Sequence, residues 1–243
     1  MDLSSFPKAA GLVSAGQHSA RWQPGLGRTL HNEIFAAADE AGGVACALAL
    51  ALDGFRVEAS VVEKPVLWVQ DEGSRRKTGR PYRPGLPPAL RHRVIHVATK
   101  NAADALFALE EGLRCRDLAF VIGEIFGNPR ELGLTSSRRL SLATERHGVP
   151  LFLVRHDAQR DLGSARMRWQ VRSVASPRPC WNAAAPGQPC WHAELFRARA
   201  HPPSEWILRD DCNTLIASAP AQSSAPDHGD LAGPAGAGSL AAG

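Results

Sequence analysis

The stretch of this sequence that comes closest to known chemistry is a small, glycine-containing turn, residues 36–45 (AAADEAGGVA), between a predicted strand and a predicted helix. In an open α/β sheet, phosphate loops occupy this kind of turn. A working phosphate loop also needs a Lys for the phosphates and a Ser or Thr for Mg²⁺. No Lys occurs between Lys8 and Lys64, and no Ser or Thr between Thr29 and Ser60. We therefore interpret the turn as a degenerate nucleotide loop, comprising Asp39, Glu40, Gly42, Gly43 and Val44.

Glu124 follows a nearly all-apolar segment, residues 118–123 (LAFVIG), which we predict to be a strand in the middle of a parallel sheet. An acidic side chain in such a place holds Mg²⁺ in nucleotide-hydrolysing proteins. A metal ligand without a phosphate cradle is weak support for ATP binding, however. The sequence favours the alternative, a solvated Glu at a strand end, and we predict no catalytic residue, no metal site and no cofactor.

The positive charge is concentrated in one segment. The chain carries 28 Lys and Arg against 24 Asp and Glu, yet residues 73–103 contain no acidic side chain, so the rest of the chain is net acidic. We expect residues 71–93 to form an exposed loop with a short helix at 88–92. Its cations can contact phosphates, and Tyr82 can stack on an unpaired base. The alternatives are docking on an acidic partner or plain solvation. The candidates for DNA or partner binding are Arg75, Arg76, Lys77, Arg80, Tyr82, Arg83, Arg91 and Arg93.

A Pro-Cys-Trp triplet occurs twice near the carboxyl end, at residues 179–181 and 189–191. Zinc ligands usually come as closely spaced pairs, and this ten-residue spacing lacks that pattern. The alternative is a Pro-rich loop with two Trp anchors, in which Trp191 begins a strand and Trp181 is partly exposed. Exposed tryptophans on such a loop are typical anchors of protein interfaces. We therefore take Trp181 and Trp191 as candidates for binding a partner.

Other reactive side chains do not form a recognisable centre. His147, His156 and Asp157 have no Ser or Cys nucleophile beside them, and we interpret them as surface residues at a helix end and a strand end. The five cysteines are odd in number and widely spaced, so a disulfide framework is not expected.

The elements that would position these residues alternate along the chain. Predicted strands at 32–37, 66–70, 94–99, 118–123 and 151–155 are separated by helices at 41–52, after an Asn101 N-cap, and from Thr135 or Ser136 to His147. This alternation predicts an α/β fold with a mostly parallel sheet. Beyond residue 165 the segments are β-like, with a hairpin pairing 193–198 and 204–208.

We expect a flexible segment over residues 1–24, an α/β core over 25–165, a β extension over 166–216 and a disordered Ala/Gly/Ser/Pro-rich tail over 217–243. Residues 1–20 contain no apolar run of signal-peptide length, and no stretch reaches the length of a membrane span. We therefore expect a cytoplasmic protein with no membrane partner.

Four stretches resemble the ImuA family of bacterial inducible-mutagenesis proteins, in the same order and spacing over roughly residues 20–215. They are 25–35 (GLGRTLHNEIF), 104–124 (DALFALEEGLRCRDLAFVIGE), 137–150 (SRRLSLATERHGVP) and 164–173 (SARMRWQVRS). ImuA resembles the ATPase core of RecA and the cell-division inhibitor SulA. It is encoded beside ImuB, a Y-family-like polymerase homologue, and an error-prone C-family polymerase.

The resemblance implies a RecA-like sheet flanked by helices, and a non-catalytic role in the translesion synthesis of the SOS response. Residues 33–35 match the strand that leads into the phosphate loop of RecA, and residues 42–45 lie near its Gly-Lys-Thr-Thr run. Residues 151–155 match the strand before the second DNA loop, for which 156–163 would be a shortened counterpart. The implied partners are an ImuB-like protein, a C-family polymerase, RecA and single-stranded DNA, with nucleoid association on induction.

Two alternatives stay open at this point. A DNA-dependent ATPase could use an altered phosphate loop, and a SulA-like protein could inhibit cell division by capping a filament-forming partner.

Overall fold

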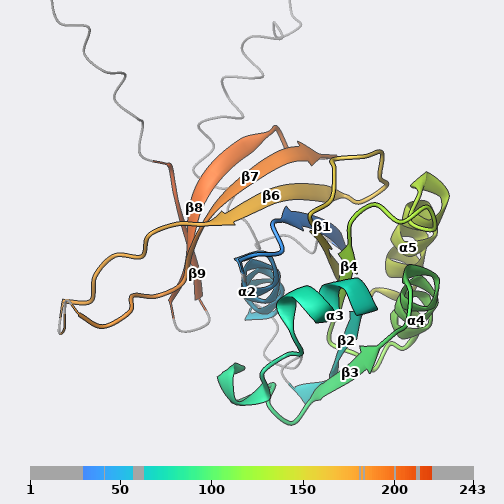
Figure 1. The fold of residues 1–243 in the computed structure, drawn as a ribbon, viewed down its shortest axis with the longest axis horizontal. Helices are drawn as coiled ribbons and strands as arrows, with labels where there is room; N and C mark the ends of the chain where they lie inside the picture. Colours follow the sequence, from blue (N-terminus) through green and yellow to red (C-terminus); the bar gives the residue numbers. More distant parts are fainter. Residues whose placement is uncertain are drawn as a thin grey trace, which may run out of the picture.

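The structure, a computed structural model, describes residues 30–40, 42–56, 63–180, 182, 184–199, 201–211 and 214–220. Within these ranges, strands assemble into one sheet of order β3-β2-β4-β5-β1-β6-β7-β8-β9 (Figure 1). The parallel part comprises β1 (His31–Ala36), β2 (Val66–Gln70), β3 (Val94–Ala98), β4 (Val121–Phe126), β5 (Leu151–His156) and β6 (Met167–Ser173). The strands β7 (Cys190–Ala198), β8 (Ser204–Asp211) and β9 (Thr214–Ser218) continue it antiparallel.

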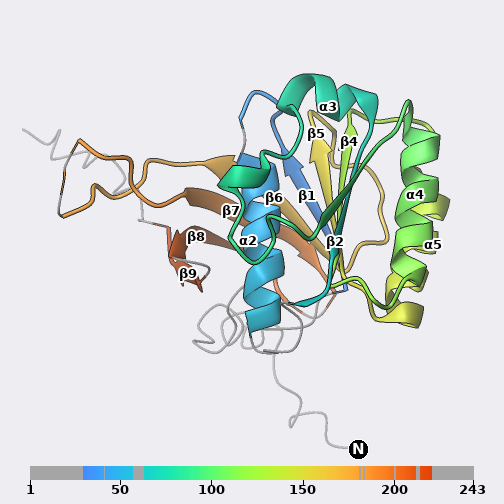
Figure 2. The same cartoon turned by 90° about the horizontal axis from the view of Figure 1, so that it is seen from below.

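Helices cover both faces of the parallel part. The helices α4 (Ala102–Arg114) and α5 (Leu134–His147) lie on one face and α2 (Gly42–Arg56) on the other (Figure 2). The short α3 (Glu72–Thr78) follows β2 at the carboxyl edge, and a 3-10 turn, η3 (Arg83–Gly85), comes after it. The predicted α/β class, with a mostly parallel sheet and a C-terminal antiparallel group, is confirmed. Among the described residues, no helix combines the length and apolarity that crossing a membrane requires.

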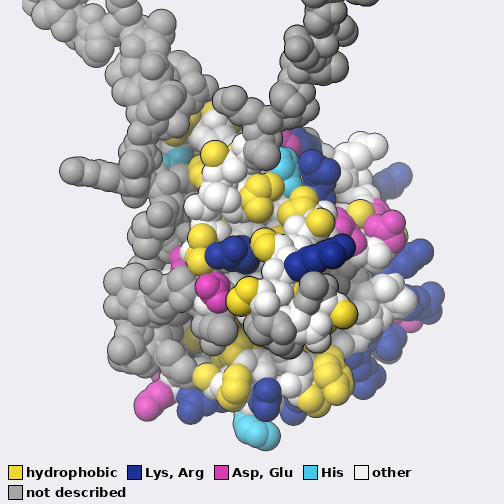
Figure 3. All heavy atoms as spheres, turned by 90° about the vertical axis from the view of Figure 1, so that its left-hand side faces the viewer, with side chains coloured by type: hydrophobic (Ala, Val, Ile, Leu, Met, Phe, Trp, Pro, Cys, Tyr) yellow, Lys and Arg dark blue, Asp and Glu magenta, His cyan; other side chains and the backbone are white. Residues whose placement is uncertain are grey.

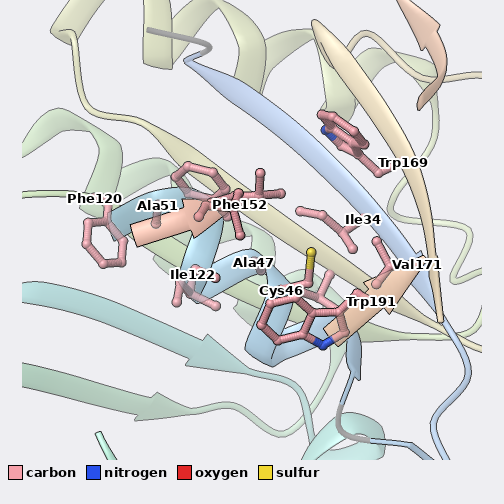
Figure 4. Close-up of a cluster of buried hydrophobic side chains, with 14 of the residues drawn as sticks. Ile34, Cys46, Ala47, Ala51, Phe120, Ile122, Phe152, Trp169, Val171 and Trp191 are labelled. Atoms are coloured by element: carbon pink, nitrogen blue, oxygen red, sulfur yellow. The ribbon is translucent and has the colours of Figure 1, made fainter. Parts of the chain in front are cut away.

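The α2 face carries the larger hydrophobic cluster (Figure 4). Ile34, Ile122 and Trp169 of the sheet pack there with Ala47 of the helix. A Cβ on Gly43 would lie 2.4 Å from the Cβ of Ala36, so α2 sits against β1 at a distance that only glycine permits. Near its other end, the Asp53 carboxylate accepts a hydrogen bond of 3.2 Å from the Leu215 N–H of β9. The antiparallel strands therefore enclose α2 rather than merely extending the sheet.

The opposite face is covered by α4 and α5. The sequence predicts the N-cap of α4 correctly and the N-cap of α5 wrongly. Asn101 caps α4 as predicted, its Oδ1 accepting from the Asp104 N–H at 2.8 Å. The predicted cap of α5 by Thr135 or Ser136 is wrong, because Gly133 is the N-cap and the Ser136 hydroxyl donates to the Glu131 carbonyl.

Two further predictions need correction. The strand expected at 118–123 begins at Val121 instead, because a turn carries the chain through residue 118, where the Leu118 N–H donates to the Cys115 carbonyl. The loop expected at 71–93 starts as helix α3, because the Asp71 carboxylate caps it by accepting from the Ser74 N–H at 2.7 Å. No helix forms at 88–92, where the chain makes turns.

The hairpin expected between 193–198 and 204–208 is confirmed by the pairing of β7 with β8. Strand β9 runs to Ser218, two residues into the segment expected as a tail. The rest of that tail, residues 221–243, and the expected flexible segment 1–24 lie outside the described residues.

Candidate functional site

Two carboxylates hold the turn between β1 and α2 against the residue that follows β5 and against β6. The Ala38 N–H donates to the Asp157 Oδ1 at 2.9 Å, and the Ser173 N–H donates to the Glu40 Oε2 at 2.9 Å. Asp157 also returns a backbone hydrogen bond of 3.0 Å to the Ala36 carbonyl. In a phosphate loop, backbone N–H groups point at the bound anion. Here an aspartate that follows β5 already takes the Ala38 N–H.

The first turn of α2 is closely covered as well. A Cβ on Gly42 would lie 2.6 Å from the Ser173 Oγ and 3.5 Å from the Trp191 ring. Asp39 lies exposed in the same turn, so the turn carries a second acidic side chain besides Glu40. The described residues of this turn therefore have the geometry of a packing turn.

Glu124 is not a solvated residue at a strand end, as the sequence suggested. It lies inside β4, directly opposite Gln70 of β2, and its side chain is 1% exposed. Its Oε1 accepts from Trp68 Nε1 at 2.6 Å and from Gln70 Nε2 at 2.9 Å. Its Oε2 accepts from the Thr78 hydroxyl at 3.0 Å and lies 3.0 Å from His156 Nε2. Four neighbours thus occupy this carboxylate, which leaves it poorly placed to act as a metal ligand.

The hydrogen bonds around Glu124 continue toward the edge of the sheet. The Gln70 amide donates to the Gly79 carbonyl at 2.9 Å, and its Oε1 lies 2.8 Å from His96 Nε2. Burial, together with the positive charge of Arg80, lowers the pKa of His96 below its usual value. The result is a polar network that ties β2, β3, β4, β5 and α3 together.

A groove of about 430 Å³ opens above this network. Val44 and Leu48 of α2 form one wall, and Arg80 and Tyr82 lie on the other. Its remaining polar and aromatic lining includes Trp68, Gln70, Thr78 and Glu124. The groove therefore joins residues from the predicted nucleotide loop to residues from the predicted basic segment. Sequence reasoning missed Trp68 and Gln70, although their alternation along a strand places them on one face.

Two arginines of the basic segment bond to backbone carbonyls of the protein, although both residues are exposed. Arg83 donates to the Val94 carbonyl at 3.2 Å and Arg91 to the Leu86 carbonyl at 3.0 Å, so both fasten the segment to the protein. Arg93 is half-buried and also has a partner. The sequence did not distinguish these arginines from freely exposed ones.

The other candidates of the segment face solvent to differing degrees. Arg76 pairs with Glu72 at 2.6 Å, and the half-buried Arg75 lies 3.8 Å from the same carboxylate. Lys77 is exposed, 6.0 Å from the Phe126 ring centre, and Tyr82 is 73% exposed. Arg80 is exposed at the rim of the groove. In the face seen in Figure 3, basic side chains lie among hydrophobic and uncharged ones and do not form one continuous basic field.

The arginines within and beside the expected shortened DNA loop, residues 156–163, pair with carboxylates of the protein itself. Arg155 is buried and donates to the Glu33 carboxylate at 2.9 Å, while Arg168 donates to the other oxygen of Glu33 at 2.6 Å. Arg160 bonds to Glu194 of β7 at 3.1 Å and stacks over the Phe196 ring. The buried Glu33 ion pairs were not expected from the sequence, because they join residues more than 120 positions apart.

Two more sequence-based interpretations change. Trp191 is 3% exposed in the α2 core, so it cannot anchor a partner, and Trp181 lies outside the described residues. His156 is buried against Glu124 and is not a surface residue, whereas Asp157 is exposed. Among the residues that the structure describes, no group of three or more His, Cys, Asp or Glu side chains is arranged to hold a metal ion.

The chain was also compared with known proteins. No model of a known protein family matches it, and no curated protein matches it significantly.

Proposed function

We propose that this chain is a non-catalytic adaptor of DNA-damage-induced translesion synthesis, of the ImuA kind, with a RecA-like core that no longer uses a nucleotide. The observation that carries the proposal is the Asp157 carboxylate on the Ala38 N–H. A turn with the position of a phosphate loop is held closed by the chain's own anion, and the nearby Glu124 is engaged by four neighbours. Such a site supports binding functions better than turnover.

The arrangement of the central strands supports the RecA-like assignment. The resemblance places the phosphate loop after β1 and a DNA loop after β5, and the acidic residue expected of a nucleotide-hydrolysing protein lies in β4. These three strands are neighbours in the order β4-β5-β1 and run parallel, so their carboxyl ends share one edge of the sheet. In open α/β sheets that edge carries the functional loops.

The proposed partners are an ImuB-like polymerase homologue, an error-prone C-family polymerase and RecA, in the cytoplasm and at the nucleoid after induction. The test is co-purification of the full chain with the ImuB-like protein, together with ATP turnover measured with and without single-stranded DNA. We expect a stable complex and no DNA-stimulated turnover. DNA-stimulated hydrolysis that is abolished by changing Gly43 or Glu124 would support the ATPase alternative. Binding to a cell-division protein without affinity for the polymerase homologue would support the SulA-like alternative.

Contact with single-stranded DNA is proposed through the exposed side of α3 and the residues after it. Lys77, Arg80 and the 73% exposed Tyr82 offer cations and a stacking surface on one segment. Neutralising Arg75, Arg76 and Lys77 should weaken DNA binding and flatten its salt dependence, because each phosphate contact releases counterions. The matched control neutralises the exposed Arg114 and Arg116 of the α4 end. Equal affinities and salt slopes in both variants would assign the segment to protein contacts.

A further inference from the structure

A second groove, of about 630 Å³, lies on the α5 side of the sheet. It runs between α5 and the chain at the start of β6 and the end of β7, a place that neither the nucleotide turn nor the basic segment reaches. Its larger lining side chains are Leu134, Arg138, Leu142, Arg166, Arg197 and Arg199. None of the described residues that line it is acidic.

The four arginines of this groove are not equally neutralised. Arg166 is held by Glu145, to which its Nε donates at 2.6 Å. Arg138, Arg197 and Arg199 are exposed, and no ion pair joins them to the described residues. Guanidinium groups gathered in a hollow raise the local positive potential, which favours an anionic occupant.

One wall of the groove is apolar as well as basic. Leu134, Arg138 and Leu142 follow one another at four-residue intervals and therefore form a stripe along one side of α5, about 12 Å long at a rise of ~1.5 Å per residue. Leu134 is 53% exposed and Leu142 is 54% exposed. The helix buries other side chains, such as Leu140 and Thr144, against the sheet.

We infer that this groove binds an acidic amphipathic segment of a partner protein. Carboxylates of that segment would meet the guanidinium groups, for which the planar fork of Arg is well suited, and its apolar side chains would cover Leu134 and Leu142. No aromatic side chain lines the groove, so it has no surface on which nucleic-acid bases would stack. Exposed leucines beside unpaired arginines match a protein partner better than a phosphate backbone.

The inference does not require the partner to be a polymerase homologue. The probe is a fluorescein-labelled helical peptide of about 16 residues, with Leu at every fourth position and Glu at most others. Binding to the full chain is followed by fluorescence anisotropy. We expect Arg138→Glu to weaken binding about 5- to 10-fold, and the double variant Leu134→Ser, Leu142→Ser to weaken it while keeping the salt dependence. The matched control is Arg146→Glu, an exposed arginine of α5 outside the groove, which should change affinity less than about 2-fold.

Four results would overturn the inference. Equal weakening by Arg146→Glu would mean general charge attraction to α5. Equal binding of a peptide with Ala in place of every Leu would show that Leu134 and Leu142 take no part in recognition. No binding of the Leu-containing peptide would rule out an acidic amphipathic segment as the occupant. Tighter binding of an oligothymidylate of similar length, lost with Arg138→Glu, would make the groove a nucleic-acid site. None of these results bears on ATP turnover or on the polymerase complex, so the proposed function stands or fails separately.

Discussion

Replacing Glu124 by Ala tests whether this carboxylate stabilises the fold or serves to bind a ligand. Its two oxygens contact Trp68, Gln70, Thr78 and His156, all at 2.6 to 3.0 Å. Two of these partners keep another acceptor after the change. The Gln70 amide group, one of whose N–H groups stays on the Gly79 carbonyl, also has Thr78 Oγ1 as an acceptor at 3.4 Å. The Thr78 hydroxyl retains the Ser74 carbonyl at 3.0 Å.

Trp68 and His156 have no second hydrogen-bond acceptor of this kind. Glu124 is the hydrogen-bond acceptor found for Trp68 Nε1, and His156 Nδ1 already lacks a partner within the described structure. A buried donor left unpaired costs about 1–3 kcal/mol, so two of them should lower the free energy of unfolding by about 4 kcal/mol. Glu124→Gln should cost less, about 1–2 kcal/mol, because the amide oxygen still accepts while the Thr78 hydroxyl can turn to accept from the amide N–H.

The assay is urea unfolding followed by far-UV circular dichroism and by tryptophan fluorescence. The matched control is Glu111→Ala, which removes an exposed carboxylate paired with Arg114 at 2.8 Å on α4 and should cost less than about 1 kcal/mol. An Ala variant as stable as the parent, or more stable, would refute the reasoning. That result is expected of a carboxylate held in a strained position for a ligand, because removing it removes the strain and raises the free energy of unfolding.

Three further predictions concern buried ionisable groups. Glu33→Ala leaves two buried arginines without their shared carboxylate and should cost about 3–5 kcal/mol in urea unfolding, against less than about 1 kcal/mol for the exposed Glu145→Ala. Burial, with nearby arginines, lowers the pKa of His31 to about 3, so the unfolded chain binds one more proton between pH 6.5 and 3. The contribution of His31 to the free energy of unfolding should be fully present above pH 6.5 and fall by about 1.4 kcal/mol per pH unit below it. His31→Asn should flatten this pH dependence. An equal loss of stability in the parent and in the variant would show that His31 is not its cause. Burial raises the pKa of the Cys46 thiol, so iodoacetamide at pH 8 should modify the exposed Cys115 but reach Cys46 only after unfolding, as mass spectrometry can check.

Local sequence signals predicted the elements that depend on local interactions. The bounds of β2 follow from a short apolar run after a proline, and the start of α4 follows from the Asn101 cap. Helix α3 was missed because Gly73, Gly79 and a cluster of cations are typical of a loop, although Asp71 supplies a readable cap. Its placement at the carboxyl edge of the sheet is stabilised by contacts with Phe126 that sequence spacing does not show.

The candidate site was harder to predict because its geometry depends on strand register. Glu124 ends an apolar run and therefore looked like a strand end, but pairing of β4 with β2 places it beside donors that lie more than 40 residues away. The missing Lys of the turn could be read from the sequence, whereas the Asp157 carboxylate that closes this turn could not. The Pro and Cys neighbours of Trp191 suggest a partner anchor, yet the pairing of β6 with β7 brings this residue into the core.

The enclosure of α2 has a consequence for mapping partners by truncation. The helix is anchored at its first turn by Ser173 and Trp191 and toward its last turn by the hydrogen bond from Leu215 to Asp53. Shortened chains that stop before β9 would lose the Leu215 anchor of α2, so lost binding would report a destabilised fold and not a lost contact. A shortened chain that ends at residue 220 keeps every one of these anchors, and that is the boundary from which interaction mapping should start.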